Sequence, residues 1–230
     1  MITVIYFTGS GHSQAVAEWM ADKLSCKATA QESLGNPVEN VTTVVVFPVY
    51  CQNVPPPVVA FLKQLRAPHV GLIATYGGFS HGNVLWEAQR ILGERVIFGA
   101  YLPTGHSCLG EPATFDTIAL EPLLQRCESP SAAIMPRTPK NPLADLAPAW
   151  RSRTGIRMMR TETCDGCGLC TRLCPMGAMR NGISSRKCIR CLRCVSNCPR
   201  QALIIKNTLP MRLYFQKPRK AKRTRPEIYL

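Results

Sequence analysis

The sequence has no apolar run long enough to span a bilayer, and no charged segment or cleavage site precedes its first apolar stretch, Ile2 to Phe7. These absences argue against a membrane span and a secretory leader, so we expect a cytoplasmic protein. Acidic residues are also scarce in the C-terminal part. Residues 151–230 contain 3 Asp and Glu against 19 Lys and Arg, whereas residues 1–150 contain 11 against 9. The basic excess of the chain is therefore confined to its second part.

Cysteine, in contrast, is abundant: 12 of the 230 residues are cysteines, and eight of them form two runs of identical spacing. Each run reads Cys-x-x-Cys-x-x-Cys-x-x-x-Cys-Pro, and the second begins 24 residues after the first. This is the spacing of bacterial-type ferredoxins with two [4Fe-4S] clusters, in which the last cysteine of each run binds the other run's cluster. The expected ligands are Cys164, Cys167, Cys170 and Cys198 for cluster I, and Cys188, Cys191, Cys194 and Cys174 for cluster II.

Two other uses of these cysteines fit the spacing less well. Zinc sites also use Cys-x-x-Cys pairs, but they separate two such pairs by a longer finger. Disulfides are disfavoured, because eight closely spaced thiols in a chain with no recognisable leader are typical of metal ligands. The other four cysteines, which show no ligand spacing, are Cys26, Cys51, Cys108 and Cys127.

The residues before the cysteine runs alternate between apolar stretches and segments with helical periodicity. The segments Ser13 to Ser25 and Pro57 to Arg66 place their apolar side chains on one face of a helix. With 46% hydrophobic residues, the chain can bury one large core and one small one. The alternation predicts a parallel sheet covered by helices. The expected strands are Ile2 to Phe7, Val41 to Tyr50, Val70 to Tyr76 and Val96 to Leu102.

A loop of small and hydroxyl-bearing residues connects the first expected strand to the first expected helix. Backbone N–H groups at a helix N-terminus can bind a phosphate, and glycines let the anion approach closely. The loop lacks the third glycine of a Rossmann fingerprint and the Gly-Lys-Ser/Thr ending of a Walker loop. An ordinary strand-to-helix turn is the alternative. The loop consists of Thr8, Gly9, Ser10, Gly11, His12 and Ser13.

The positions of Thr8, Ser10, Gly11 and Ser13 in this loop resemble the phosphate loop of flavodoxins. Two later segments, 48–55 and 75–79, resemble the flavin-ring loops of that family. With the cysteine runs that follow, nearly the whole chain resembles the flavodoxin–ferredoxin fusion proteins of anaerobic microbes. The resemblance implies a doubly wound α/β sheet of strand order 2-1-3-4-5 that binds FMN, followed by a small α+β ferredoxin domain.

The resemblance also implies which residues surround the flavin ring. Tyr50 and either Tyr76 or Phe79 would stack on the ring, although Tyr50 and Tyr76 could equally be core aromatics. Gly77 and Gly78 would let backbone amides reach the edge of the ring. No glycine follows Tyr50 before position 55. Flavodoxins often have a glycine there, which turns a peptide towards flavin N5 and stabilises the neutral semiquinone. The expected ring-binding residues are Pro48, Tyr50, Cys51, Tyr76, Gly77, Gly78 and Phe79.

These segments divide the chain into three expected parts. Residues 1–150 form the FMN-binding domain, with a proline-rich connector over 129–150, residues 151–210 form the ferredoxin domain, and residues 211–230 form a basic tail. The tail composition is typical of a solvated segment. Docking to an acidic redox partner is the alternative, and nucleic acid is disfavoured because no recognition motif accompanies the charge. The densest basic part of the tail contains Lys217, Arg219, Lys220 and Lys222.

A flavin accepts electrons singly or in pairs, whereas each cluster passes one electron at a time. The sequence therefore predicts an electron-transfer protein that passes low-potential electrons between two [4Fe-4S] clusters and FMN and links external redox partners. The alternative is an FMN-dependent reductase of a small organic substrate, with the clusters as electron input and His81 as a proton donor. No acid–base pair stands out in the sequence, so an electron carrier is preferred to an enzyme.

Overall fold

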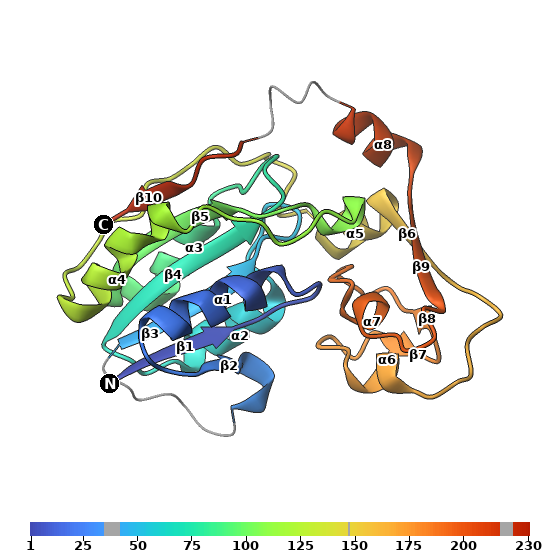
Figure 1. The fold of residues 1–230 in the computed structure, drawn as a ribbon. Coiled ribbons are helices and arrows are strands. Elements are labelled where there is room, and N and C mark those ends of the chain that lie inside the picture. Colours follow the sequence, from blue (N-terminus) through green and yellow to red (C-terminus); the bar gives the residue numbers. More distant parts are fainter. Residues whose placement is uncertain (35–41, 147, 217–222) are drawn as a thin grey trace. The chain divides into compact units, whose positions relative to one another are not determined.

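The computed structural model describes residues 1–34, 42–146, 148–216 and 223–230 (Figure 1). Two earlier expectations fall partly outside these residues: Val41 of the second expected strand, and four basic residues of the expected tail, Lys217, Arg219, Lys220 and Lys222. The chain divides into two compact units, one comprising Met1–Asn141 with Arg223–Leu230 and the other Pro142–Lys222. The second unit is therefore an insertion in the sequence of the first.

The first unit contains a six-stranded sheet with the predicted strand order 2-1-3-4-5, extended at one edge by a further strand. Strands β1 to β5 are all parallel. Strands that are buried on both faces are nearly all apolar, which explains why the sequence predicts the central strands well. The strands are β1 (Ile2–Tyr6), β2 (Ala28–Ala30), β3 (Thr42–Pro48), β4 (His69–Tyr76) and β5 (Val96–Pro103).

Helices cover both faces of this sheet, and each face has its own apolar core (Figure 1). On one face Val58 of α2 and Leu85 of α3 are buried with Phe47 of the sheet. On the other face Met20 of α1 and Leu123 of α4 are buried. The arrangement is the doubly wound fold that the sequence predicts. The helices are α1 (His12–Lys23), α2 (Pro56–Gln64), α3 (Val84–Leu92) and α4 (Glu121–Glu128), with short 3-10 turns at Gln31–Ser33, Gly93–Arg95, Ser107–Leu109 and Ile118–Leu120.

The end of the chain differs from the basic tail expected over 211–230. Residues Glu227–Tyr229 form strand β10, which pairs antiparallel with β5 at the edge of the sheet. Ile228 packs against the core on one face, and Tyr229 packs against the core on the other. Burial of these apolar side chains stabilises the packing of the last residues against the first unit.

The connector expected over 129–150 also packs against the first unit at its start. Ala133 and Met135 are buried, and Gln89 of α3 holds both through hydrogen bonds to their backbone. Proline-rich segments of this kind can follow a surface without forming a regular element when their remaining apolar side chains are buried. The segment therefore extends the core of the first unit before the chain leaves it.

The second unit is a small α+β structure. Strands β6 and β9 pair antiparallel, and β7 and β8 form a short hairpin. Two one-turn helices, α6 and α7, each follow the first cysteines of one run, so the internal repeat of the sequence is also a repeat of structure. The helical and strand segments are α5 (Pro148–Gly155), β6 (Ile156–Arg160), α6 (Leu169–Arg172), β7 (Met179–Arg180), β8 (Ile183–Ser184), α7 (Arg193–Ser196), β9 (Leu203–Asn207) and α8 (Leu209–Phe215). No helix among the described residues is long and apolar enough to cross a membrane.

Candidate functional site

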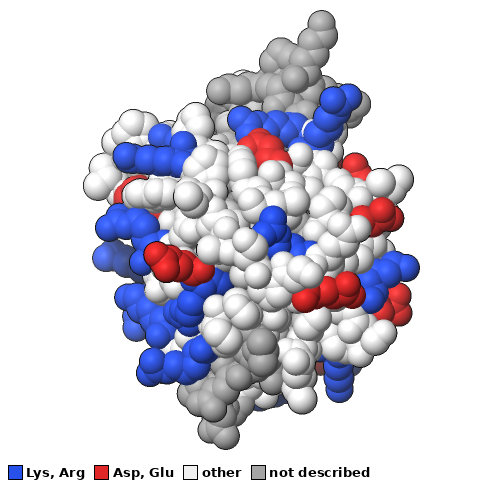
Figure 2. Space-filling view, turned by 90° about the vertical axis from the view of Figure 1, so that its left-hand side faces the viewer, with Lys and Arg blue, Asp and Glu red and all other residues white. Residues whose placement is uncertain are grey.

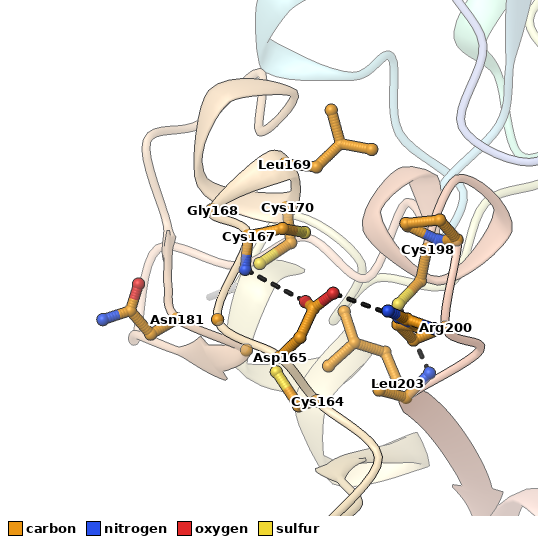
Figure 3. A pocket seen from close by; sticks show the side chains of 14 residues that line it. Cys164, Asp165, Cys167, Gly168, Leu169, Cys170, Asn181, Cys198, Arg200 and Leu203 are labelled. Atoms are coloured by element: carbon orange, nitrogen blue, oxygen red, sulfur yellow. Dashed lines mark hydrogen bonds and ion pairs between the residues drawn. The ribbon is translucent and has the colours of Figure 1, made fainter.

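The second unit contains two hollows, each lined by four of the eight cysteines in the two runs. Figure 3 shows the first, in which cysteines from two separate segments surround one space. Each hollow combines the first three cysteines of one run with the last cysteine of the other. In the described residues no group of three or more His, Cys, Asp or Glu side chains could hold a single metal ion. The first hollow is lined by Cys164, Cys167, Cys170 and Cys198, and the second by Cys188, Cys191, Cys194 and Cys174.

The turns between the cysteines need left-handed backbone. In the first run Gly166 and Gly168 have φ of 75° and 72°, which glycine adopts without strain. In the second run the equivalent residues are Arg190 and Leu192, with φ of 55° and 67°. Side chains at such angles cost free energy, so the second run reaches the same turn with more strain.

Backbone N–H groups reach the last cysteine of each run in the same way. Ala178 donates to Cys174 Sγ at 3.1 Å, and Ala202 donates to Cys198 Sγ at 3.3 Å. Hydrogen bonds to cysteine sulfur stabilise negative charge on a bound iron–sulfur cluster. The last cysteines of the two runs, Cys174 and Cys198, therefore accept equivalent backbone hydrogen bonds.

The thiols of the second hollow are the more deeply buried. Cys188 and Cys194 are 7% and 6% exposed, whereas Cys167 of the first hollow is exposed. Burial raises the pKa of Cys194 to about 12 and that of Cys191 to about 11. These thiols therefore hold their protons until a metal displaces them.

An acidic residue stands beside the first hollow. Asp165 accepts a hydrogen bond from the backbone N–H of Cys167 and pairs with Arg200 Nε at 3.1 Å (Figure 3). The hydrogen bond from Arg200 and then that from Cys167 hold the pKa of Asp165 below its usual value. The carboxylate and the guanidinium are both solvent-exposed, so their charges are screened by water.

In the first unit, the loop between β1 and α1 keeps its helix N-terminus open. Gly11 precedes α1 with φ of 91°, and no side-chain cap bonds to the first turn in the described structure. Thr8 Oγ1 accepts from the Gly11 N–H at 3.0 Å. The uncapped N–H groups of α1 therefore remain as donors for an anion.

The other polar side chains of this loop are engaged within the protein. His12 Nε2 donates to the Glu111 carbonyl at 3.0 Å, which leaves Nδ1 to accept from the Ser10 hydroxyl at 2.9 Å. The buried Ser13 hydroxyl bonds to Thr75 Oγ1 at 2.8 Å. These bonds fix the loop against the end of β4, and they make the backbone, more than the hydroxyls, the available anion-binding group.

The segment after β3 makes a strained tight turn. Tyr50 and Asn53 exchange backbone hydrogen bonds of 3.2 and 3.0 Å around Cys51 and Gln52, whose φ values are 51° and 67°. This is the φ pattern of a type I′ turn, which usually requires glycine or asparagine. Pro48 and Tyr50 on the approach to the turn are half-buried. The tight turn thus forms although neither Cys51 nor Gln52 is a glycine.

The aromatic residues expected after β4 occupy two different environments. Tyr76 is only 5% exposed and packs edge-on against His81, so it belongs to the core. Phe79 is half-buried and packs edge-on against His106. A side chain at Gly77 would collide with His106, since its Cβ would lie 2.2 Å from that ring. Of the two alternatives, Phe79 is the less buried residue.

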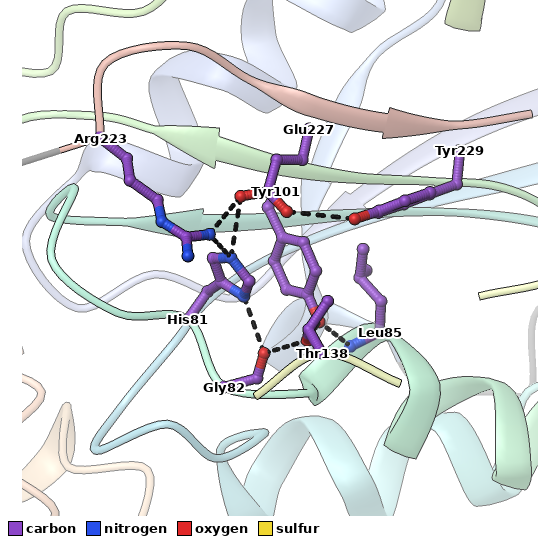
Figure 4. A network of polar contacts seen from close by, with 8 residues as sticks. All are labelled: His81, Gly82, Leu85, Tyr101, Thr138, Arg223, Glu227 and Tyr229. Carbon is purple, nitrogen blue, oxygen red and sulfur yellow. Dashed lines mark hydrogen bonds and ion pairs between the residues drawn. The ribbon is translucent and has the colours of Figure 1, made fainter. Parts of the chain in front are cut away.

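Beside this segment, His81 is the centre of a polar network that the sequence did not predict (Figure 4). The buried His81 stacks on Tyr101 and donates through Nδ1 to the Gly82 carbonyl at 2.7 Å. Its Nε2 lies 2.7 Å from Arg223 Nη1 and 3.2 Å from Glu227 Oε1. Both ring nitrogens are therefore engaged. Because 146 residues separate His81 from Glu227, no local pattern could have predicted the pair.

The network continues to Tyr229 and has a clear electrostatic balance. Burial acts to raise the pKa of Glu227, but His81, Tyr229 and Arg223 outweigh it and the pKa lies below its usual value. Burial and the bond to Glu227 raise the pKa of Tyr229 to about 12. Arg223 also donates its backbone N–H to the Gly78 carbonyl at 2.6 Å. The returning chain is thus joined to the segment after β4.

Comparison with known proteins identifies the second unit most directly. Residues 158–199 match the family described as 4Fe-4S dicluster domain, and the match contains both cysteine runs. No curated protein matches the chain. Among solved structures, the chain is similar to one titled "Structure of a flavodoxin from the domain Archaea", at 17% identity and a TM-score of 0.35, covering 41% of this chain and 76% of that one. The chain thus joins an α/β unit of flavodoxin-like strand order to an iron–sulfur unit of ferredoxin type.

Proposed function

We propose that the protein transfers electrons between FMN bound by the first unit and two [4Fe-4S] clusters bound by the second, and so links external redox partners. The observation that carries the proposal is the grouping of the cysteines, because two hollows with four sulfurs each suit two cubane clusters. When bound, the clusters exchange single electrons and FMN exchanges one or two. A chain that holds both can convert between one- and two-electron partners.

The proposed cluster ligands follow the hollows. Cluster I is held by Cys164, Cys167, Cys170 and Cys198, and cluster II by Cys188, Cys191, Cys194 and Cys174. The N–H groups of Ala178 and Ala202 support the fourth ligand in each case. Four thiolates around each cluster leave about −2 of net charge per site in the oxidised state, which the basic residues of the unit offset.

The proposed FMN site uses the three segments at the carboxyl ends of β1, β3 and β4, the edge at which flavodoxin-like sheets bind their ligand. The backbone of the first turn of α1 takes the phosphate. Tyr50 and Phe79 contact the ring, and Tyr76 supports the segment from the core. The proposed site residues are Thr8, Gly9, Ser10, Gly11, His12, Ser13, Pro48, Tyr50, Cys51, Tyr76, Gly77, Gly78 and Phe79.

The reductase alternative gains no support from the site. Its expected proton donor, His81, is 3% exposed and has both ring nitrogens engaged by Gly82, Arg223 and Glu227. A proton donor must reach a substrate within hydrogen-bonding distance. His81 is instead a structural residue that joins the end of the chain to the sheet.

The charge distribution supports an acidic redox protein as partner. The first unit has 11 Lys and Arg and 11 Asp and Glu, so the whole net charge of +14 lies on residues 142–222, with 17 basic and 3 acidic residues. Figure 2 shows a face that carries both basic and acidic side chains, with several basic side chains along one edge. Opposite charges guide such encounters and hold the pair in register.

The direct test is the cofactor content of the protein purified without oxygen. We expect iron and sulfide for two [4Fe-4S] clusters and one FMN per chain, and flavin bands that bleach together with the broad cluster absorbance during stepwise reduction. Cluster absorbance without flavin, after FMN has been supplied, would contradict the flavin part of the proposal. Iron for one cluster alone would contradict the assignment of two.

A further inference from the structure

The second cysteine hollow has a charged side chain in contact with one of its sulfurs. In the second hollow, Arg190 Nη1 donates to Cys188 Sγ at 3.2 Å. The equivalent residue in the first run is Gly166, which has no side chain to do so. Beside the first hollow, the acidic Asp165 is paired with Arg200. One cysteine ligand set therefore has a guanidinium against sulfur, and the other has a neutralised ion pair nearby.

Arg190 is fixed in place by both neighbouring strands of the unit. Its Nε donates to the Ile156 carbonyl of β6 at 3.1 Å, and its Nη1 donates to Ser184 Oγ of β8 at 2.8 Å. The side chain is half-buried. A guanidinium with these bonds is pre-organised, so little rotamer freedom is lost in keeping it on the sulfur.

The backbone of Arg190 shows that this contact is maintained at a cost. Its φ of 55° is left-handed, where the first run has Gly166 at 75°. Glycine would relieve the strain and would remove the guanidinium. An arginine in a position suited to glycine points to a role for its side chain.

Burial in the second hollow makes a positive charge useful there. The sulfurs of Cys188 and Cys194 are buried, and adding an electron to a buried anionic site is opposed by desolvation. The site carries about −2 before reduction and about −3 after it. A charge-assisted hydrogen bond to a cysteine sulfur stabilises the more negative state more strongly.

We propose that Arg190 raises the reduction potential of cluster II and so keeps this buried cluster reducible. The inference rests on the proposed function, since it requires both clusters. One electron enters from an external low-potential donor, and no bond forms or breaks. The guanidinium acts through Cys188, and it is therefore a positioning and tuning residue that needs no contact with the inorganic core.

The test is a redox titration of the anaerobically purified full chain, followed by EPR. Arg190→Gln removes the charge, and we expect the midpoint potential of cluster II to fall by the equivalent of about tenfold in its reduction equilibrium, which is about 59 mV for one electron. Cluster I should keep its potential. Arg190→Lys should give a smaller fall, because it keeps the charge and loses the planar fork.

Two further variants make the test independent of damage to the second hollow. Gly166→Arg puts the same side chain at the equivalent position of the first run, where φ is 75° and a Cβ would meet no atom within 4 Å. It should raise the potential of cluster I. Arg186→Gln removes an exposed charge from the same segment and should leave both potentials almost unchanged. If Arg190→Gln loses its cluster, Gly166→Arg still decides the question.

The controls separate this inference from the proposed function. If the unsubstituted chain contains iron for two clusters, the premise of the inference about Arg190 is met. If that iron is absent, the proposed function is refuted instead. Repeating Arg190→Gln in a Cys198→Ser background assigns the signal, because cluster II alone is expected there. Equal potentials in Arg190→Gln and the unsubstituted chain, or equal shifts of both clusters, would overturn the role of Arg190.

Discussion

The last cysteines of the two runs provide a matched pair of single-residue tests. Cys198 lines the hollow of the first run, and Cys174 lines that of the second. We expect Cys198→Ser to remove cluster I and leave cluster II, and Cys174→Ser to do the reverse, because thiolates bind these clusters far better than hydroxyls. Iron content should fall by about half in each variant. If Cys198→Ser instead removed the cluster of the second run, the ligand assignment would be wrong.

Glu227 predicts a pH dependence for the stability of the first unit. Burial opposes its ionisation, yet His81, Tyr229 and Arg223 hold its pKa below the ordinary value of 4.5. A carboxyl with a lowered pKa stabilises the fold above pH 4.5, and this contribution is lost as pH falls from there through the folded-state pKa. Urea unfolding between about pH 7 and pH 3 should show this loss, on the order of 1 kcal/mol for a partly exposed group.

The control for this dependence is an exposed carboxylate in the same unit. Glu227→Gln should remove the loss between neutral and acidic pH and should lower stability at neutral pH. Glu128→Gln, at an exposed position of α4, should leave the pH profile unchanged. Identical profiles for the original chain and Glu227→Gln would show that the carboxylate does not stabilise the fold.

The roles of individual residues were predictable where residues of one chemical type are closely spaced in the sequence. The eight cysteines are spaced by a few residues, so their grouping can be argued from the sequence alone. Arg190 is adjacent to a cysteine of the second run, but the sequence gives no sign that its side chain turns back to Cys188. Tyr76 shows the opposite limit, because an aromatic residue at the end of a strand looks the same in sequence whether it faces a ligand or the core.

At the scale of elements, the entry to α1 is the segment whose backbone the proposed FMN site needs most. Gly11 has φ of 91° and open space around its Cβ position. We expect Gly11→Val to distort the loop, because a β-branched residue avoids this conformation, at a cost of about 1 to 2 kcal/mol. FMN content should fall while iron content stays constant.

Gly93 supplies the matched control for this loop. It too has a positive φ, of 66°, and no atom within 4 Å of its Cβ position, but it ends α3. Gly93 also has ψ of −140°, which only glycine adopts readily, so Gly93→Val should cost at least as much stability and still leave FMN bound. Equal flavin loss in both variants would attribute the effect to general strain, and full flavin retention in Gly11→Val would remove the phosphate-loop proposal.

Elements of the first unit were predictable to the extent that burial sets their pattern. β3, β4 and β5 are long apolar runs because helices cover both faces of the parallel sheet. β10 has three residues and follows a basic, proline-containing segment, so nothing local marks it as a strand. Its pairing with β5 depends on contacts between residues more than 120 positions apart, such as Ile228 with Ala100. Tertiary contacts therefore determine that β10 forms, in a segment whose composition predicts a tail.

At the scale of the whole molecule, the chain leaves and re-enters the first unit at segments proposed to surround FMN. The Asn141 backbone N–H donates to Gln52 Oε1 at 2.7 Å, and the Arg223 backbone N–H donates to the Gly78 carbonyl. The chain therefore leaves and re-enters the first unit beside the segments that follow β3 and β4. Tethering at both ends keeps the two units at a high effective concentration without requiring a fixed interface.

The separation of charge predicts how an external partner meets the protein. The first unit has no net formal charge, and the insertion carries all of the +14, reduced to about +10 if two clusters contribute about −2 each. Electron transfer from an acidic redox protein should therefore slow by about tenfold between low and high salt, because salt screens the attraction that speeds encounter. Stopped-flow reduction of the clusters measures this rate. A basic redox protein should show the opposite trend, and an uncharged small reductant should show almost none, since neither is attracted to the insertion. A rate from the acidic protein that is independent of salt would place the productive contact on the uncharged first unit, and the electron would then have to enter through FMN.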